Sequence, residues 1–191
     1  IDALPSSGDN CNAALDGISR VRLVQGQLDE SSALLDPILG AIRAPIDRRV
    51  YAYRYAKLTH TEVLARQGRS LDALMSANEL IGLAAETGDH LLNQMALLTK
   101  AELLQQNGNV AEAMNTLDAL ADTLAQQPPE LFAHYDRILA CTLAARGDVE
   151  TATLHFDRAK RTYESIRSTP GLVELLRRWR RATAAAEDNG P

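Results

Sequence analysis

The sequence predicts an all-α protein: a right-handed α-solenoid of about four helical hairpins with a C-terminal capping helix. Gly26, Gly68, Gly108 and Gly147 recur at intervals of 42, 40 and 39 residues, each between two segments rich in leucine and alanine. A repeat of this size is one helical hairpin, which buries its apolar face only by stacking on its neighbours. Aromatic residues make up only 4% of the chain, and abundant Ala and Leu favour helix packing over a sheet.

The first repeat is expected over residues 10–43. Its leading helix, over residues 10–25, is too mixed in polarity to be fully buried, which is typical of a terminal repeat. In the second segment, which starts at Asp29, we expect Pro37 to kink or restart the helix because proline lacks an amide hydrogen and its ring clashes with the preceding turn. Asp36 is placed to cap the new turn.

The second and third repeats are expected over residues 46–87 and 89–127. The leading helix of the second repeat is expected to run from residue 46 and to end at Gly68, a residue suited to the left-handed conformation at a helix C-terminus. In the third repeat, Asn109 and Glu112 have the spacing of a capping box, in which two side chains satisfy the free amides of a helix start. We therefore expect a second helix to begin there.

The fourth repeat is expected over residues 130–166, with Asp148 capping its second helix. Pro170 and Gly171 are expected to separate this repeat from a capping helix over residues 172–186. The capping helix mixes apolar residues with arginines, as a terminal helix with one solvated face does.

The repeats run almost from end to end, so residues 1–191 are interpreted as a single domain. Because the chain begins at Ile1 and not at methionine, we expect it to be a fragment of a larger protein. No stretch approaches the roughly 20 uncharged apolar residues that span a bilayer, and no signal segment opens the chain, which favours a cytoplasmic location without membrane contact. Cys11 and Cys141 lie in different repeats and are expected to be buried free thiols.

Positions counted from each glycine alternate between small and large residues. The fifth residues after the glycines are Ser31, Ala73, Ala113 and Ala152, and the ninth are Leu35, Ala77, Leu117 and Phe156. The twelfth residues after them are Ile38, Leu80, Leu120 and Ala159. The seventh residues before the glycines are Ser19, Thr61, Ala101 and Ala140. This pattern resembles the tetratricopeptide repeat, in which small residues let two helices approach closely.

The repeat departs from the usual tetratricopeptide pattern in three ways: it exceeds the usual length of about 34 residues, lacks the early aromatic residue, and does not place proline at the fixed position. Repeats of about 40 residues resemble the divergent tetratricopeptide regions of large bacterial transcription activators of the LuxR and MalT-like kind and of related signalling proteins. The resemblance covers roughly residues 10–166.

In tetratricopeptide arrays the first helix of each hairpin lines a concave surface, so the resemblance implies a binding groove at fixed offsets before each glycine. Ten residues are expected to contact a partner there: Tyr55, Leu58, Glu62, Arg66, Met95, Leu98, Glu102, Gln106, His134 and Arg137. Cys141 lies at a further such offset. Aromatic, apolar and charged side chains together suit a peptide or helix laid into a groove.

The expected function is therefore that of a protein-interaction or regulatory scaffold within a bacterial transcription or signalling regulator, binding a peptide or protein partner. Two alternatives stay open. In one, a small molecule or signalling peptide enters the solenoid channel as an effector. In the other, the first or last helix mediates self-association and the protein forms a homodimer.

The sequence does not favour an enzyme, because it contains no nucleophile, zinc-protease or nucleotide-binding motif. The four histidines lie in different repeats without metal-ligand spacing, so we expect no metal and no other cofactor. Net charge is −5, but residues 158–181 carry a local balance of +6. Four arginines around Trp179 could bind phosphate. The negative total charge and the helix dipole argue against nucleic-acid contact, and Trp179 is expected to cover the apolar end of the last repeat.

Overall fold

The computed structural model describes residues 7–41, 44–124 and 127–188. These residues form nine α-helices and one short 3-10 helix and contain no strand, so the all-α prediction is confirmed. The internal contacts divide the chain into two compact units, Ile1–Ala96 and Leu97–Pro191, and each is described by itself. Along the ranges given above, none of the helices combines the length and apolar character needed to cross a membrane.

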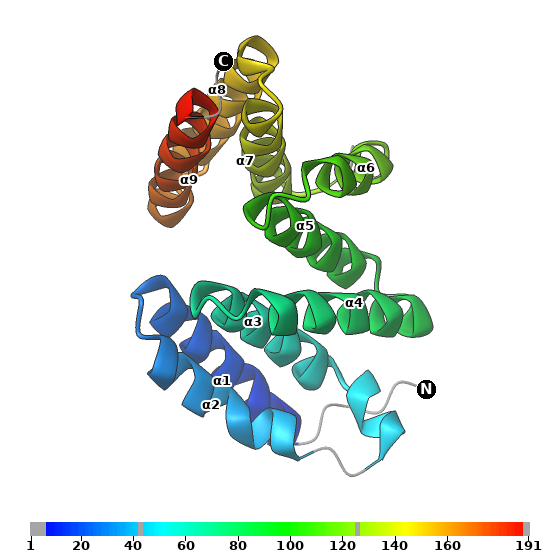
Figure 1. The fold of residues 1–191 in the computed structure, drawn as a ribbon. Helices are drawn as coiled ribbons and strands as arrows, with labels where there is room; N and C mark the ends of the chain where they lie inside the picture. The colour runs from blue at the N-terminus through cyan, green and yellow to red at the C-terminus, as the bar shows by residue number, and fades with distance from the viewer. Residues whose placement is uncertain (1–6, 42–43, 125–126, 189–191) are drawn as a thin grey trace. The chain divides into compact units, whose positions relative to one another are not determined.

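The N-terminal unit consists of two helical hairpins and the start of a further helix (Figure 1). Its elements are α1 (Ser7–Val24), α2 (Leu28–Gly40), the 3-10 helix η1 (Pro45–Arg49), α3 (Tyr51–Arg66), α4 (Ser70–Thr87) and the first part of α5 (His90–Gln106). Helices α1 and α2 pack on each other, and both also pack on α3, which pairs with α4.

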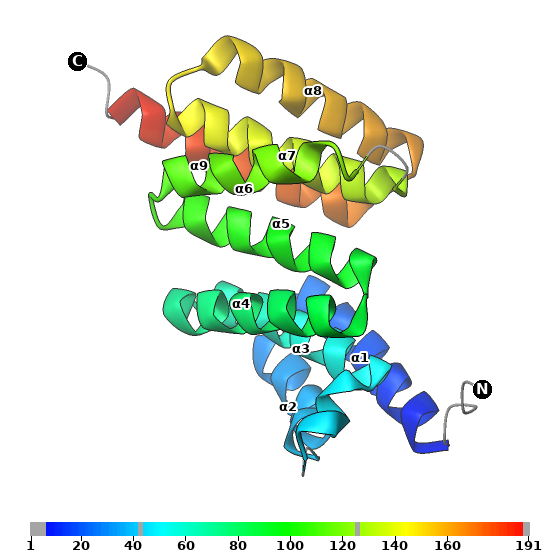
Figure 2. The same ribbon diagram turned by 90° about the vertical axis from the view of Figure 1, so that its right-hand side faces the viewer.

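The C-terminal unit contains the rest of α5 and four more helices (Figure 2). These are α6 (Val110–Ala121), α7 (Pro129–Ala145), α8 (Val149–Ser165) and α9 (Thr169–Asp188). Helices α7 and α8 pack on each other along an extensive contact, and α9 packs on both. Helix α6 packs on α7.

The four periodic glycines adopt one backbone conformation. Their φ angles are 78°, 79°, 80° and 84°, in the left-handed region where a side chain would be strained. At each, the next residue donates its amide to the carbonyl five residues earlier, with N–O distances of 2.9, 3.0, 2.9 and 3.1 Å. This is the Schellman ending of a helix, which satisfies carbonyls at its C-terminus. The prediction for Gly68 is confirmed, and the same turn recurs in all four hairpins.

The small positions of the repeat are the tightest points of each hairpin. The seventh residue before each glycine and the fifth residue after it are fully buried, whether serine, threonine or alanine: Ser19, Thr61, Ala101 and Ala140; Ser31, Ala73, Ala113 and Ala152. In the first hairpin the two serines bond reciprocally, each hydroxyl donating to the other's backbone carbonyl at 2.9 Å. Close approach of the paired helices therefore depends on small side chains here.

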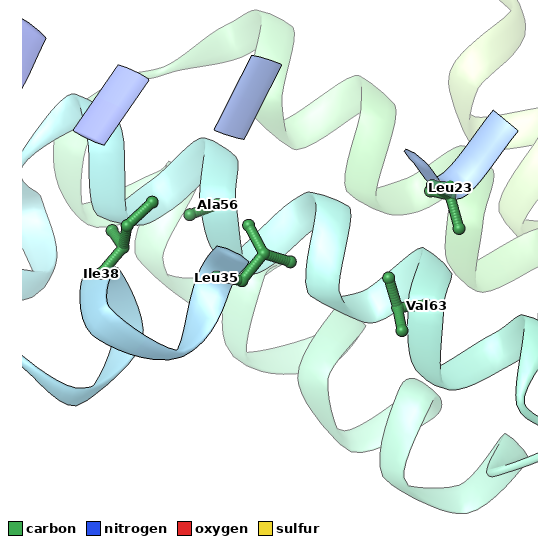
Figure 3. Close-up of a cluster of buried hydrophobic side chains, with 5 residues drawn as sticks. All are labelled: Leu23, Leu35, Ile38, Ala56 and Val63. Carbon is green, nitrogen blue, oxygen red and sulfur yellow. The ribbon is translucent and has the colours of Figure 1, made fainter. Parts of the chain in front are cut away.

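Clusters of buried apolar residues fill the space between helices. Figure 3 shows one cluster of the N-terminal unit, built by α1, α2 and α3 from Leu23, Leu35, Ile38, Ala56 and Val63. A second cluster joins α3, α4 and the start of α5 through Leu58, Leu80, Ala84, Leu92 and Ala96. In the C-terminal unit, α7, α8 and α9 meet around Ala133, Ala159, Tyr163 and Leu175.

Two helix boundaries of the N-terminal unit differ from the prediction. The restart at Pro37 is wrong: α2 continues through this residue to Gly40 as one helix. The second leading helix begins at Tyr51 and not at residue 46, because Pro45 starts a separate 3-10 turn and Val50 is extended between the two elements.

The two helix caps predicted in the C-terminal unit have different outcomes. Asp148 caps α8 as predicted, accepting a bond from the amide of Thr151 at 3.2 Å. Helix α6 begins at Val110, directly after Asn109, as predicted, but the Asn109 side chain makes no capping bond, so the capping box is not formed. Helix α6 also ends at Ala121, earlier than expected.

Pro170 and Gly171 do not separate α8 from α9. Both lie in the first turn of α9, where a missing amide hydrogen costs nothing. The break is made instead by Arg167, whose φ of 56° ends α8. Gly171 has a packing role: a Cβ atom there would lie 2.4 Å from the ring of Tyr163.

Candidate functional site

A cluster of five charged side chains joins three helices of the C-terminal unit. Its centre is a bidentate ion pair between Glu102 on α5 and Arg137 on α7, with N–O distances of 2.5 and 3.1 Å. The side chains of Glu102 and Arg137 are only 20% and 8% exposed. We call this group, together with the three α9 residues described next, the Glu102 cluster.

Helix α9 supplies the other members, Glu174, Arg177 and Arg178. The Nε atom of Arg178 lies 3.3 Å from Glu102 and 2.7 Å from Glu174, so this arginine connects the two carboxylates. Arg177 adds a bidentate contact to Glu174 at 3.0 and 2.6 Å. Three guanidinium groups thus face two carboxylates.

These contacts keep both carboxylates ionised. Burial alone would raise the pKa of Glu102, but Arg137 and then Arg178 outweigh it and lower that pKa to about 2. At Glu174, burial is likewise outweighed by Arg177 and Arg178, and the pKa falls to about 2. The pKa of Arg137 is raised: burial lowers it, and the charge of Glu102 more than compensates.

Cys141 and Tyr163 are neighbours of the Glu102 cluster. Cys141, one turn along α7 from Arg137, is buried, and burial raises the pKa of its thiol to about 11, so it stays protonated at neutral pH. Burial also raises the pKa of Tyr163 to about 12, and its ring lies 6.0 Å from that of His134. Within the described ranges no group of three or more His, Cys, Asp or Glu residues could hold a metal ion.

A separate group of polar contacts, centred on the buried Asp136, connects α7 and α8. Asp136 accepts from the Nε of Arg158 at 2.5 Å and lies 2.9 Å from the Nδ1 of His155. The hydrogen bond to Asp136 raises the pKa of Arg158. All three side chains belong to one helix pair, so these contacts hold the hairpin together.

The structure brings the predicted groove residues of the C-terminal unit together in part. Glu102 and Arg137, predicted from their offsets alone, are direct partners. His134 is half-buried on α7, and Gln106 is exposed at the end of α5. Leu98 is 3% exposed and belongs to the core, so a partner cannot reach it.

The groove residues predicted in the N-terminal unit lie on α3 and at the start of α5. Tyr55 stacks on Tyr51 with ring centroids 4.3 Å apart and also packs against the cluster that contains Leu58. Leu58 itself is a core residue, 2% exposed. Three further positions remain at least partly accessible: Glu62, Arg66 and Met95. The guanidinium of Arg66 donates to the carbonyl of Leu23 at 3.0 Å.

Sequence reasoning missed the contribution of α9. Glu174 and Arg178 have the i, i+4 spacing of a helical ion pair, and this signal could have drawn attention to them. The arginines of α9 were interpreted as a solvated face, which holds for the exposed Arg180 and Arg181. Trp179 packs on Phe156 of α8 at a centroid distance of 4.7 Å.

One further prediction is wrong: Cys11 is exposed on α1, although it was expected to be buried. The chain matches no family model, no curated protein and no solved structure. Its membership of the tetratricopeptide family therefore stays a prediction, carried by the repeat pattern.

Proposed function

We propose that this chain is a tetratricopeptide-like solenoid module of a regulatory protein, and that it binds a peptide or protein partner on its leading helices by docking without chemistry. The observation that carries the proposal is the recurrence of one hairpin: four glycines share a left-handed turn, and the same small positions are fully buried around each. Equivalent residues of α3, α5 and α7 then occupy equivalent places in their repeats, as the leading helices of solenoid repeats do.

In the C-terminal unit the proposed surface comprises Gln106, His134 and the Glu102 cluster. The three arginines and two glutamates of the cluster leave it one positive charge in excess, which favours a partner segment with an acidic side chain. Arg177 is the most accessible member, with 41% of its side chain exposed.

In the N-terminal unit the proposed surface comprises Tyr55, Glu62, Arg66 and Met95. The stacked Tyr51–Tyr55 pair supplies a large aromatic contact. Aromatic and arginine side chains dominate the binding energy of many protein interfaces, and Tyr loses little conformational entropy on binding.

A displayed library of random peptides tests this proposal, because selection from it requires no identified partner. We expect peptides enriched on the wild-type chain to lose binding to the variants Arg66→Glu or Gln106→Glu, which alter exposed ends of α3 and α5. Lys160→Glu, an exposed change on the second helix α8, is the matched control and should leave binding unchanged. Peptides that distinguish none of the variants, or that respond only to Lys160→Glu, would place the binding surface elsewhere.

A further inference from the structure

Helix α9 has the place of a leading helix. It packs on both helices of the hairpin before it, α7 and α8, as α3 packs on α1 and α2 (Figure 2). It also ends two residues before a glycine, because Asp188 is its last residue and Gly190 follows, 43 residues after Gly147. The leading helices of the four complete hairpins end at the same distance before their glycines, at Val24, Arg66, Gln106 and Ala145. Helix α9 therefore has the register of the first helix of a fifth hairpin.

Two positions that are covered in every complete hairpin are open in α9. Counted back from the glycine, the seventh and tenth residues of the leading helices are buried: Ser19, Thr61, Ala101 and Ala140; Asp16, Leu58, Leu98 and Arg137. The second helix contributes to this cover, since the Thr61 hydroxyl lies 2.7 Å from that of Ser76 on α4. Counted back from Gly190, the same positions are Thr183, which is half-buried, and Arg180, which is exposed.

The open surface combines apolar and basic side chains. Val173, Leu176, Arg180 and Thr183 follow one another at intervals of three or four residues and so share one face of the helix, which we call the α9 face. Val173 and Leu176 are 60% and 41% exposed. Arg180 and its exposed neighbour Arg181 form no ion pair among the side chains that the structure describes.

Charge pairing in the complete hairpins indicates what covers such a face. In three of them a cation on the leading helix pairs with a carboxylate on the second helix: Arg22 with Glu30 at 3.4 Å, Lys57 with Glu79 at 2.6 Å, and Lys100 with Glu112 at 3.7 Å. In the fourth the signs are reversed, and Asp136 accepts from Arg158. The α9 face carries a cation and no carboxylate, so a helix that covers it should supply carboxylates.

We propose that the α9 face binds an amphipathic, acidic helix of a partner protein, which packs antiparallel to α9 in the place of a second helix. Apolar side chains of this helix cover Val173 and Leu176, a small residue lies against Thr183, and a carboxylate pairs with Arg180. The α9 face shares no residue with the surfaces proposed above for partner binding. Either proposal can therefore fail without the other.

A synthetic peptide of residues 109–124 with blocked ends and a fluorescent label is the probe. This segment contains α6, one of the second helices, and its charged residues are all acidic: Glu112, Asp118 and Asp122. We expect saturable binding to the whole chain, measured by fluorescence anisotropy. A peptide in which amides replace the three carboxylates should bind roughly tenfold more weakly.

Variants of the chain test the charge and the close packing separately. Arg180→Glu should weaken binding roughly tenfold, whereas Lys160→Glu, the same change of charge at an exposed position of α8, should leave it unchanged. Thr183→Phe should weaken binding by roughly tenfold as well, because a bulky ring keeps the two helices apart. Thr183→Ala retains a small side chain and is the matched control. Circular dichroism checks that each variant keeps its helical signal.

Three results would each overturn the proposal: no saturable binding up to about 1 mM, equal effects of Arg180→Glu and Lys160→Glu, or unchanged binding to Thr183→Phe. Loss of binding to Gln106→Glu, with Arg180→Glu tolerated, would assign the peptide to the leading-helix surface instead. Chains that ignore the peptide and dimerise through the α9 face in sedimentation equilibrium would make a second copy the occupant, which also contradicts the proposal.

Discussion

Replacing Glu102 by glutamine should destabilise the protein by about 3 kcal/mol at neutral pH. The magnitude follows from the pKa of this carboxyl, which falls from its ordinary value of 4.5 to about 2 in the folded chain and therefore represents about 3 kcal/mol of stabilisation of the charged form. The substitution removes the ion-pair partner of the buried Arg137, and breaking a buried pair in this way typically costs about 3–5 kcal/mol.

The lowered pKa of Glu102 determines how its contribution to stability changes with pH. Because the folded-state pKa of Glu102 is depressed, its contribution is fully present above about pH 4.5 and is lost as the pH falls towards 2. The difference in the free energy of unfolding between wild type and Glu102→Gln should therefore shrink over that interval. Urea unfolding, followed by circular dichroism at a series of pH values, measures it.

Glu86→Gln is the control. It removes a carboxylate from an exposed pair with Arg49, 3.8 Å apart, and should change stability by less than about 1 kcal/mol. An effect of Glu102→Gln no larger than that of the control, or one that stays constant from neutral pH to pH 2, would refute the assignment of the Glu102 cluster as a structural link between α5, α7 and α9.

Two further predictions concern packing and thiol chemistry. Gly171→Ala should lower the free energy of unfolding by about 1–3 kcal/mol, because its new Cβ would overlap the buried ring of Tyr163. Gly82→Ala has open space around it and should stabilise α4 by up to about 1 kcal/mol. Thermal or urea unfolding that ranks the two variants in the opposite order would contradict this packing. A coloured disulfide reagent should modify Cys11 at once and Cys141 only after unfolding, since Cys141 is buried and its thiol pKa is raised to about 11. Two thiols that react at equal rates in the native protein would count against the burial of Cys141.

The hairpins could be predicted from sequence because their turns depend on local chemistry. A glycine that must adopt a left-handed conformation is visible as a glycine at a regular interval, and the second repeat, expected to end at residue 87, does end there with α4. The small positions were visible for the same reason: they recur at fixed offsets from the glycine, and close helix approach requires them.

Features that depend on tertiary contacts were harder to predict. The offsets placed Glu102 and Arg137 on equivalent faces, but the choice of Glu174 and Arg178 as additional partners depends on how α9 packs on α7 and α8, which no local pattern encodes. Cys11 was misplaced because its burial was inferred from residue type alone: unpaired cysteines are usually buried.

Proline caused three of the errors in element boundaries. Its effect on a helix depends on position: Pro37 is tolerated inside α2 and Pro170 in the first turn of α9, whereas Pro45 begins a 3-10 helix that delays α3. A proline in the sequence signals a missing amide hydrogen, but only the surrounding turn determines whether a helix ends there.

Hydrogen–deuterium exchange of the whole chain, with and without a peptide selected from the displayed library, tests most directly the claim that the leading helices form the binding surface. We expect bound peptide to slow amide exchange in α3, α5, α7 or α9 and to leave the second helices α4, α6 and α8 unchanged. Protection confined to those second helices would contradict the account.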